Sequence, residues 1–100
     1  MKNLSSRVYR SLMRVPRGKV TTYKALAESV GMKNGQRAIG RIMNRNPDPI
    51  KVPCHRVVRS DRSVGGYAYG TEKKIKLLSR EGVSIKNGKI ENWNKIIFRF

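Results

Sequence analysis

Positive charge constrains this chain more than any other feature of its sequence. The 23 lysines and arginines stand against six aspartates and glutamates, and the formal net charge is +17. Such an excess opposes compaction through self-repulsion, which a polyanionic partner relieves. A generally basic proteome or adaptation to heat are the alternatives. Heat adaptation, however, enriches glutamate alongside lysine, and acidic residues are scarce here. The charge therefore favours a nucleic acid as the partner.

Length and composition bound the fold and the chemistry. One hundred residues, 38% of them hydrophobic, allow one small domain with a modest core. No apolar run approaches the roughly 18 residues of a membrane span, and the N-terminal segment lacks a signal-peptide core. We therefore expect a cytoplasmic protein, associated with the nucleoid in a prokaryote, without membrane contact. One cysteine and one histidine exclude an internal disulfide and fall short of a zinc site, so we expect no metal and no cofactor.

The N-terminal half of the sequence predicts three helices, two of which form a helix-turn-helix. Apolar residues between positions 5 and 15 share one helical face, and a proline and a glycine then make a turn. TTYKALAESVG (21–31) has a threonine for its N-cap and a closing glycine. After a short turn, QRAIGRIMNRN (36–46) is again amphipathic. Basic residues recur every four positions on its outer side, namely Lys33, Arg37, Arg41 and Arg45. This pattern is typical of DNA-binding helix-turn-helix units, although any solvated amphipathic helix can carry a basic face.

The C-terminal half predicts short strands around one further helix. VPCHRVV (52–58) follows two prolines and is expected to be a short extended segment. A glycine-rich loop leads to the helix TEKKIKLLSRE, which we expect Thr71 to cap and Gly82 to end. Asn87-Gly88 signals a hairpin, and the apolar tail after it could dock on the core or on a partner. The expected fold is an α+β single domain with a winged-helix-like helix-turn-helix, three to four short helices and minor short strands.

The only cysteine and the only histidine are adjacent, at Cys54 and His55. The thiolate is the nucleophilic form of cysteine, and nearby cations or a histidine favour it. Neighbours in an extended segment point to opposite faces, so His55 would need a bridging water or a local kink to act as the base. Such a base needs an orienting carboxylate, and Glu81, at the end of an apolar helix, is the best candidate among the six acids. On these residues alone, a small buried structural thiol explains Cys54 equally well.

An ordered set of motifs resembles one known family. VPRGKVTTYKALA, RAIG, NRNPDPI, PCHRVV, VGGY and KKIKLLSREG follow the order seen in the O6-alkylguanine-DNA alkyltransferases, also called methylated-DNA–protein-cysteine methyltransferases. The match runs from about Val8 to Val83. The resemblance implies a repair protein that flips O6-alkylguanine out of duplex DNA and transfers the alkyl group irreversibly to its own cysteine, once per molecule. It also implies binding through the minor groove, and we expect a monomer.

The same resemblance implies roles for the residues around the cysteine. Cys54 would accept the alkyl group, His55 would deprotonate it through a water, and Glu81 would hold His55. Asn46 would brace the turn that carries the cysteine. The backbone carbonyls of Cys54 and Val57 would accept hydrogen bonds from the guanine amino group.

Further roles concern the pocket and the DNA. Tyr23 would press on the phosphate of the target nucleotide and hydrogen-bond the base ring, and Arg37 would fill the gap left by the flipped nucleotide. Arg37 belongs to the basic stripe of residues that recur every four positions, and its other members would contact phosphates, namely Lys33, Arg41 and Arg45. The pocket-lining residues would be Tyr67, Ala68 and Tyr69, with Tyr67 and the loop backbone donating to O6.

The sequence departs from the family pattern in three respects. Members usually carry an extra N-terminal domain, so we expect residues 1–100 to be a minimal or truncated version with one DNA-binding and active-site domain. Ala68 and Tyr69 stand where members often have serine and a small residue, and Tyr69 is expected to narrow the pocket against bulky alkyl groups. No family motif extends beyond Val83.

Other classes of protein stay open. Short relatives that resemble this family but lack the acceptor cysteine bind alkylated DNA and signal to other repair systems. They typically hold tryptophan at the position of Cys54, which argues against that interpretation. A plain helix-turn-helix regulator leaves PCHRVV unexplained. A cysteine hydrolase fits less well, because adjacent Cys and His are not the spatial pairing that such enzymes build.

Overall fold

Short helices make up most of the regular structure. The computed structural model describes residues 4–46, 48 and 51–100. Its elements, in chain order, are α1 (Leu4–Leu12), β1 (Thr21–Thr22), α2 (Tyr23–Ser29), α3 (Gln36–Asn44), the 3-10 turn η1 (Cys54–Arg56), β2 (Val57–Val58), α4 (Thr71–Arg80), β3 (Ile85–Lys86), β4 (Lys89–Ile90) and α5 (Trp93–Ile96). The α+β fold class is confirmed, and the tail adds the short helix α5.

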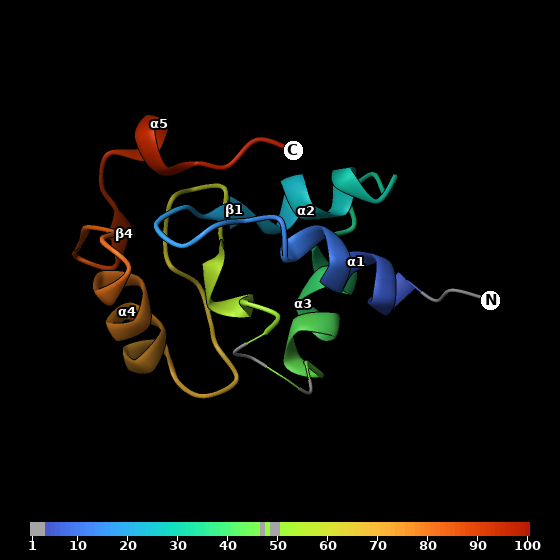
Figure 1. Cartoon of the computed structure of the whole chain (residues 1–100), viewed down its shortest axis with the longest axis horizontal. Helices are drawn as coiled ribbons and strands as arrows, with labels where there is room; N and C mark the ends of the chain where they lie inside the picture. Colours follow the sequence, from blue (N-terminus) through green and yellow to red (C-terminus); the bar gives the residue numbers. More distant parts are fainter. Residues whose placement is uncertain (1–3, 47, 49–50) are drawn as a thin grey trace.

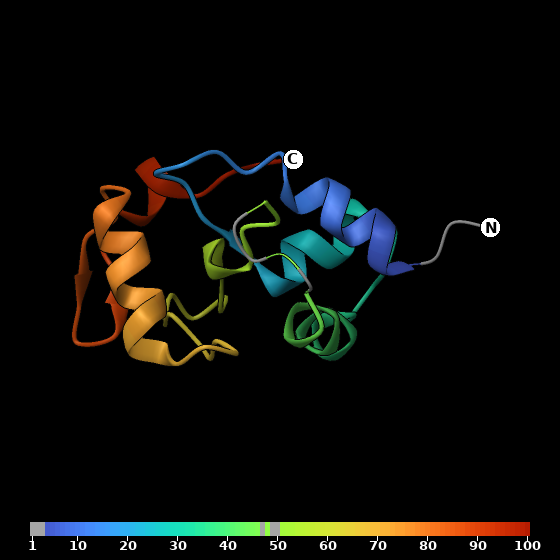
Figure 2. The same ribbon diagram turned by 60° about the horizontal axis from the view of Figure 1, so that its bottom comes forward.

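The elements fall into two groups on either side of the strand pair β1–β2 (Figure 1). Helices α1, α2 and α3 surround one hydrophobic cluster, and α4, the β3–β4 hairpin and α5 surround a second. Figure 2 shows η1 and β2 running between the two groups. Because side chains alternate along a strand, Val57 enters the first cluster and Val58 the second. The segment that follows Cys54 is therefore a wall shared by both cores.

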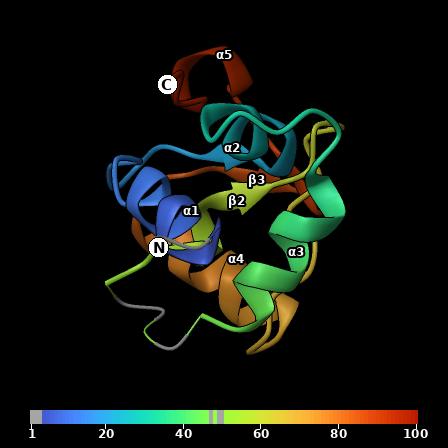
Figure 3. The same ribbon diagram turned by 90° about the vertical axis from the view of Figure 1, so that its right-hand side faces the viewer.

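The predicted helix-turn-helix is formed by α2 and α3, which Figure 3 shows side by side with β2 behind them. The side chain of Thr22 accepts a hydrogen bond from the backbone N–H of Ala25 at 3.0 Å, which confirms the threonine cap. Gly31 has a φ of +83°, the left-handed conformation in which helices often end. Buried Ile39 and Met43 fix the inner face of α3, so its basic residues point outward.

The prediction of an extended backbone through Cys54, His55 and Arg56 is wrong. These residues form a 3-10 turn after Pro53, in which the backbone N–H of Arg56 donates to the carbonyl of Pro53 at 3.0 Å. The partner strand β1 is only two residues long and pairs with Val57 and Val58 alone, so the preceding residues have no ladder to join. The two prolines that suggested an extended segment, at positions 47 and 49, lie outside the described residues.

The tail docks on the core. Asn87 and Gly88 both have positive φ values and join β3 to β4, which confirms the hairpin. The backbone N–H of Phe98 donates to the carbonyl of Val20 at 2.7 Å, so the last segment lies along β1. Gly70, rather than Thr71, occupies the N-cap of α4. In the described part of the chain, we find no helix with the length and apolar character that crossing a membrane requires.

Candidate active site

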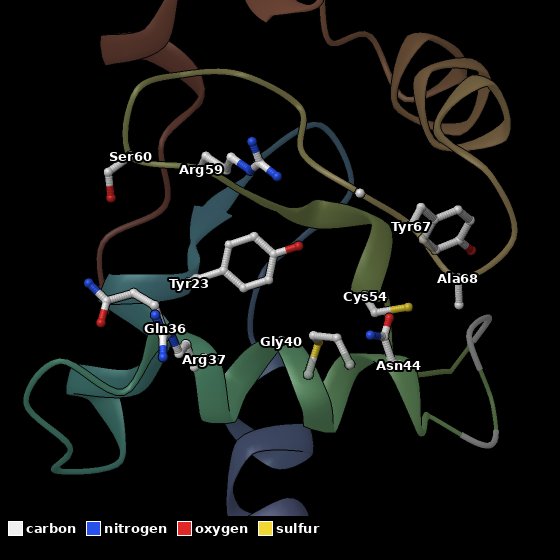
Figure 4. A pocket seen from close by; sticks show the side chains of 12 residues that line it. Tyr23, Gln36, Arg37, Gly40, Asn44, Cys54, Arg59, Ser60, Tyr67 and Ala68 are labelled. Carbon is white, nitrogen blue, oxygen red and sulfur yellow. The ribbon is translucent and has the colours of Figure 1, made fainter.

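A cavity of about 530 Å³ opens between α3 and the loop that precedes α4 (Figure 4). Tyr23, at the start of α2, and Arg37, in the first turn of α3, form one side of it. Cys54, Tyr67 and Ala68 form another. The fold therefore brings residues from four segments far apart in the sequence to one cavity. The described lining contains no acidic residue.

Cys54 lies in the wall of this cavity with 5% of its surface exposed. Its backbone N–H donates to the carbonyl of Val52 at 2.8 Å, and its carbonyl accepts from the N–H of Val57. The buried side chain of Asn46 donates to the same Val52 carbonyl at 2.8 Å, and its oxygen accepts from the N–H of Asp48 at 3.0 Å. Asn46 therefore holds the segment that enters the cysteine turn.

His55 and Glu81 meet behind the cysteine. His55 Nε2 lies 3.0 Å from Glu81 Oε2, and both side chains are less than 10% exposed. Arg56 donates to both oxygens of Glu81, at 2.9 Å from Nε and 2.7 Å from its terminal nitrogen, and also to the carbonyl of Val15. Burial alone would raise the pKa of Glu81, but the hydrogen bonds from Arg56 and His55 outweigh it and lower that pKa. Sequence reasoning placed Arg56 beside the thiol and missed this clamping contact.

The geometry fixes which nitrogen of His55 carries the proton. An ionised carboxylate only accepts hydrogen bonds, so Nε2 must donate to Glu81. Burial lowers the pKa of His55, against the opposing influence of Glu81, so the ring is neutral near pH 7. In a neutral ring with the proton on Nε2, Nδ1 carries the free lone pair. Nδ1 is buried and makes no hydrogen bond within the described residues. The arrangement supplies a base at Nδ1.

Lys74 is a buried cation that sequence reasoning overlooked. It is fully buried on α4, and its Nζ donates to the carbonyls of Val57 at 2.7 Å and Gly66 at 3.1 Å. Burial lowers its pKa to about 8. A carbonyl has two lone pairs, so the Val57 oxygen can accept one further hydrogen bond. A sequence signal existed, because Lys74 lies four residues before the core residue Leu78 and shares its helix face.

The two tyrosines of the loop lie in different places. Tyr67 lines the cavity, and burial raises its pKa to about 12, so its hydroxyl stays a donor at neutral pH. Tyr69 is 51% exposed and is not part of the lining. Its ring packs edge-on against Tyr67 with 5.4 Å between centroids, and Lys73 lies over it. In this structure Tyr69 does not narrow the cavity.

The basic stripe divides between the cavity and the outer surface. Arg37 lines the cavity, whereas the other three members are exposed beyond it: Lys33, Arg41 and Arg45. Two lining residues that follow β2, Arg59 and Ser60, were not predicted, because no motif or periodicity marks them.

The fold and the site together define a helix-turn-helix domain built around a cavity with a cysteine in its wall. Residues 3–83 match the family model described as 6-O-methylguanine DNA methyltransferase, DNA binding domain. The chain belongs to this family.

Three of the proteins similar to this chain match different shares of their own length. A methylated-DNA–protein-cysteine methyltransferase of Candida glabrata is 46% identical over 87 residues, which cover 87% of this chain and 42% of the relative. The chain therefore spans less than half of that relative's length. The structure of Mycobacterium tuberculosis OGT in complex with DNA aligns with a TM-score of 0.77 and 33% identity, over 81% of this chain and 50% of that one. S. pombe Atl1, in complex with damaged DNA containing O6-carboxymethylguanine, aligns with a TM-score of 0.86 and 28% identity, over 100% of both chains.

Proposed function

We propose that this chain repairs O6-alkylguanine in duplex DNA by transferring the alkyl group irreversibly to Cys54, once per molecule. The observation that carries the proposal is the buried chain of contacts from Arg56 through Glu81 to His55, directly behind a cysteine in a cavity wall. A merely structural thiol needs neither an oriented base nor an open cavity.

The target base must leave the duplex stack before its O6 atom can reach a cavity of this kind. Arg37 is exposed at the cavity edge, where it would occupy the gap in the stack, and Tyr23 would contact the phosphate and the ring of the flipped base. The exposed basic residues around α3 would bind the phosphates that flank the minor groove, namely Lys33, Arg41 and Arg45.

The chemistry balances without a cofactor. His55 Nδ1 takes the thiol proton of Cys54 through a water, and the thiolate sulfur attacks the alkyl carbon in line. The bond from that carbon to O6 breaks, its electron pair stays on guanine, and the guanine anion takes up one proton. The sum converts a thiol and an O6-alkylguanine into a thioether and a guanine. Tyr67 would donate to O6 as its negative charge develops, and the carbonyls of Cys54 and Val57 would receive the amino group.

Intact-mass measurement tests the proposal. The chain is incubated with duplex DNA that contains O6-methylguanine, beside a Cys54→Ser control. We expect a gain of one methyl group on the peptide that contains Cys54 and no gain in the control. Lesion binding without a gain in mass would overturn alkyl transfer.

A second function has one observation in its favour. The alignment with Atl1, which was crystallised in complex with damaged DNA, covers both chains completely. This similarity favours a protein that recognises the lesion without transferring the alkyl group. A sensor would bind the lesion in the same cavity and would leave the alkyl group in place. The mass measurement separates the two functions directly.

A further inference from the structure

Arg59 lines the cavity, and its guanidinium forms no ion pair within the described residues. It follows β2 directly, lines the cavity and is exposed. Within the described residues its guanidinium makes no hydrogen bond or ion pair. Arg56, three residues earlier, differs, because Glu81 and Val15 occupy its donors. Hydrogen bonds from a neighbouring serine, together with the charge of Arg59, lower the pKa of the exposed Asp61 carboxyl, but the side chains of Arg59 and Asp61 form no ion pair. In a lining without acids, the guanidinium is suited to bind an anion.

Backbone hydrogen bonds and a close contact with Gly65 fix the position of Arg59. Its backbone N–H donates to the carbonyl of Ser63 at 3.0 Å, and its carbonyl accepts from the N–H of Arg62 at 2.9 Å. Its side chain crosses the backbone of Gly65, where an added Cβ would lie 3.3 Å from Arg59 Cγ and 3.5 Å from Nε. Gly65 also has a φ of +74°, so both the close contact with Arg59 and the backbone conformation favour glycine at this position. The stem of the arginine is therefore held before any ligand arrives, which lowers the entropy cost of binding.

The side of the cavity on which Arg59 lies decides which anion it can meet. In Figure 4 its guanidinium extends over the Tyr23 side, whereas the sulfur of Cys54 points toward Tyr67 and Ala68. The alkyl group must lie at that sulfur, so it is remote from Arg59. The sugar and phosphate of a nucleotide whose base fills the cavity must lie toward its mouth.

We propose that Arg59 binds a phosphodiester of the extruded nucleotide and so holds that nucleotide in the cavity. This role rests on the proposed function in so far as the lesion nucleotide enters the cavity, and it does not require alkyl transfer. The planar guanidinium matches two phosphate oxygens at once, and the hydroxyl of Ser60, also in the lining, is a second donor. Arg59 is a positioning residue.

The test compares Arg59→Ala and Arg59→Lys with a charge-matched control, Arg10→Ala. Arg10 is exposed on α1 and does not line the cavity. Affinity is measured by fluorescence anisotropy for duplexes with O6-methylguanine or with guanine at the same position. We expect Arg59→Ala to lower the preference for the lesion duplex about 10- to 100-fold. Arg10→Ala should weaken both duplexes equally, and Arg59→Lys should restore part of the preference.

Replacing single phosphates of the DNA with neutral linkages identifies the phosphate that Arg59 contacts. A methylphosphonate placed 5′ or 3′ of the lesion should lower the wild-type preference by a similar factor at one of the two positions. The same linkage should cost Arg59→Ala nothing further, because the contact is already lost. Additive losses at both positions, or equal effects of Arg59→Ala and Arg10→Ala, would overturn the proposal.

The rate of reaction with free O6-methylguanine tests whether Arg59 binds a phosphate or instead shapes the base pocket. This base has no phosphate, so Arg59→Ala should react with it at the wild-type rate. An equal loss with the free base would show that Arg59 shapes the base pocket instead. If the wild type transfers no methyl group at all, the proposed function fails, and the binding measurements still decide the role of Arg59.

Discussion

Replacing Glu81 with glutamine should weaken His55 as a base. Glu81 Oε2 accepts from both His55 Nε2 and Arg56, and Oε1 accepts from Arg56 Nε. A glutamine has one amide oxygen, so its NH₂ group must take one of these two positions and face a donor of Arg56. In either orientation the amide is neutral and no longer stabilises the positive charge that the ring gains when Nδ1 takes the thiol proton. Nδ1 is then a weaker base.

The expected loss follows from the role removed. A positioned general base contributes about 10²- to 10⁴-fold, so we expect Glu81→Gln to slow alkyl transfer at least about 100-fold. The variant also loses the ion pair with Arg56, whose side chain is 16% exposed, at a stability cost of about 3 kcal/mol. Affinity for duplex DNA should stay within about twofold, because Glu81 does not line the cavity.

The chain has one histidine, so nitrogen NMR of histidine-labelled protein observes His55 alone. The wild type should show a protonated Nε2 and an unprotonated Nδ1. Burial lowers the pKa of His55 and Glu81 raises it, so Glu81→Gln should lower the pH at which the second ring nitrogen takes a proton. Transfer is followed by intact mass on the same samples, below the melting temperature of the variant. An unchanged titration of the ring together with a slower transfer would refute the reasoning, as would an unchanged rate.

Two further outcomes test other parts of the structure. Arg37→Ala should weaken reaction with duplex substrate at least about tenfold while leaving reaction with free O6-methylguanine unchanged, and equal losses would remove the arginine from the extrusion step. For Lys74, the folded pKa of about 8 lies below the 10.5 of the unfolded chain, so the buried charge costs stability at neutral pH and this cost disappears as the pH rises from 8 to 10.5. Relative to Lys74→Met, the wild type should gain about 3 kcal/mol across that range in urea unfolding, and parallel curves would show that Lys74 titrates normally.

The sequence was sufficient to predict the elements whose conformation depends on contacts between neighbouring residues. The threonine cap of α2, the glycine after it and the Asn87-Gly88 turn each depend on contacts within a few residues. The amphipathic faces of α2 and α3 then follow from the helical period. The 3-10 turn at Cys54 could not be predicted in this way. It depends on the short length of its partner strand β1, which lies more than 30 positions earlier in the sequence.

The site divides in the same manner. The motifs, taken in order along the chain, predicted Cys54, His55 and part of the cavity lining, namely Tyr23, Arg37, Tyr67 and Ala68. The pairing of His55 with Glu81 was chosen among six acids. The contacts of Arg56 and Lys74 and the place of Arg59 in the lining could not be predicted. Each is a long side chain whose charged end lies several ångströms from its backbone, so its surroundings depend on tertiary packing rather than on spacing.

The charge excess and the active site are connected through the scarcity of acids. Glu81 accepts a hydrogen bond from neutral His55 and forms an ion pair with Arg56 inside the protein. The outward-facing Arg37 and Arg41 of α3, in contrast, have no ion pair among the described residues. In the proposed function, an acid close to that surface would neutralise the cations that meet phosphate, and an acid in the cavity would repel the nucleotide backbone. One buried carboxylate would orient the base without weakening the positive surface, because Glu81 is buried and does not line the cavity. A net charge of +17 is what would remain when acids are kept away from a surface that binds phosphate.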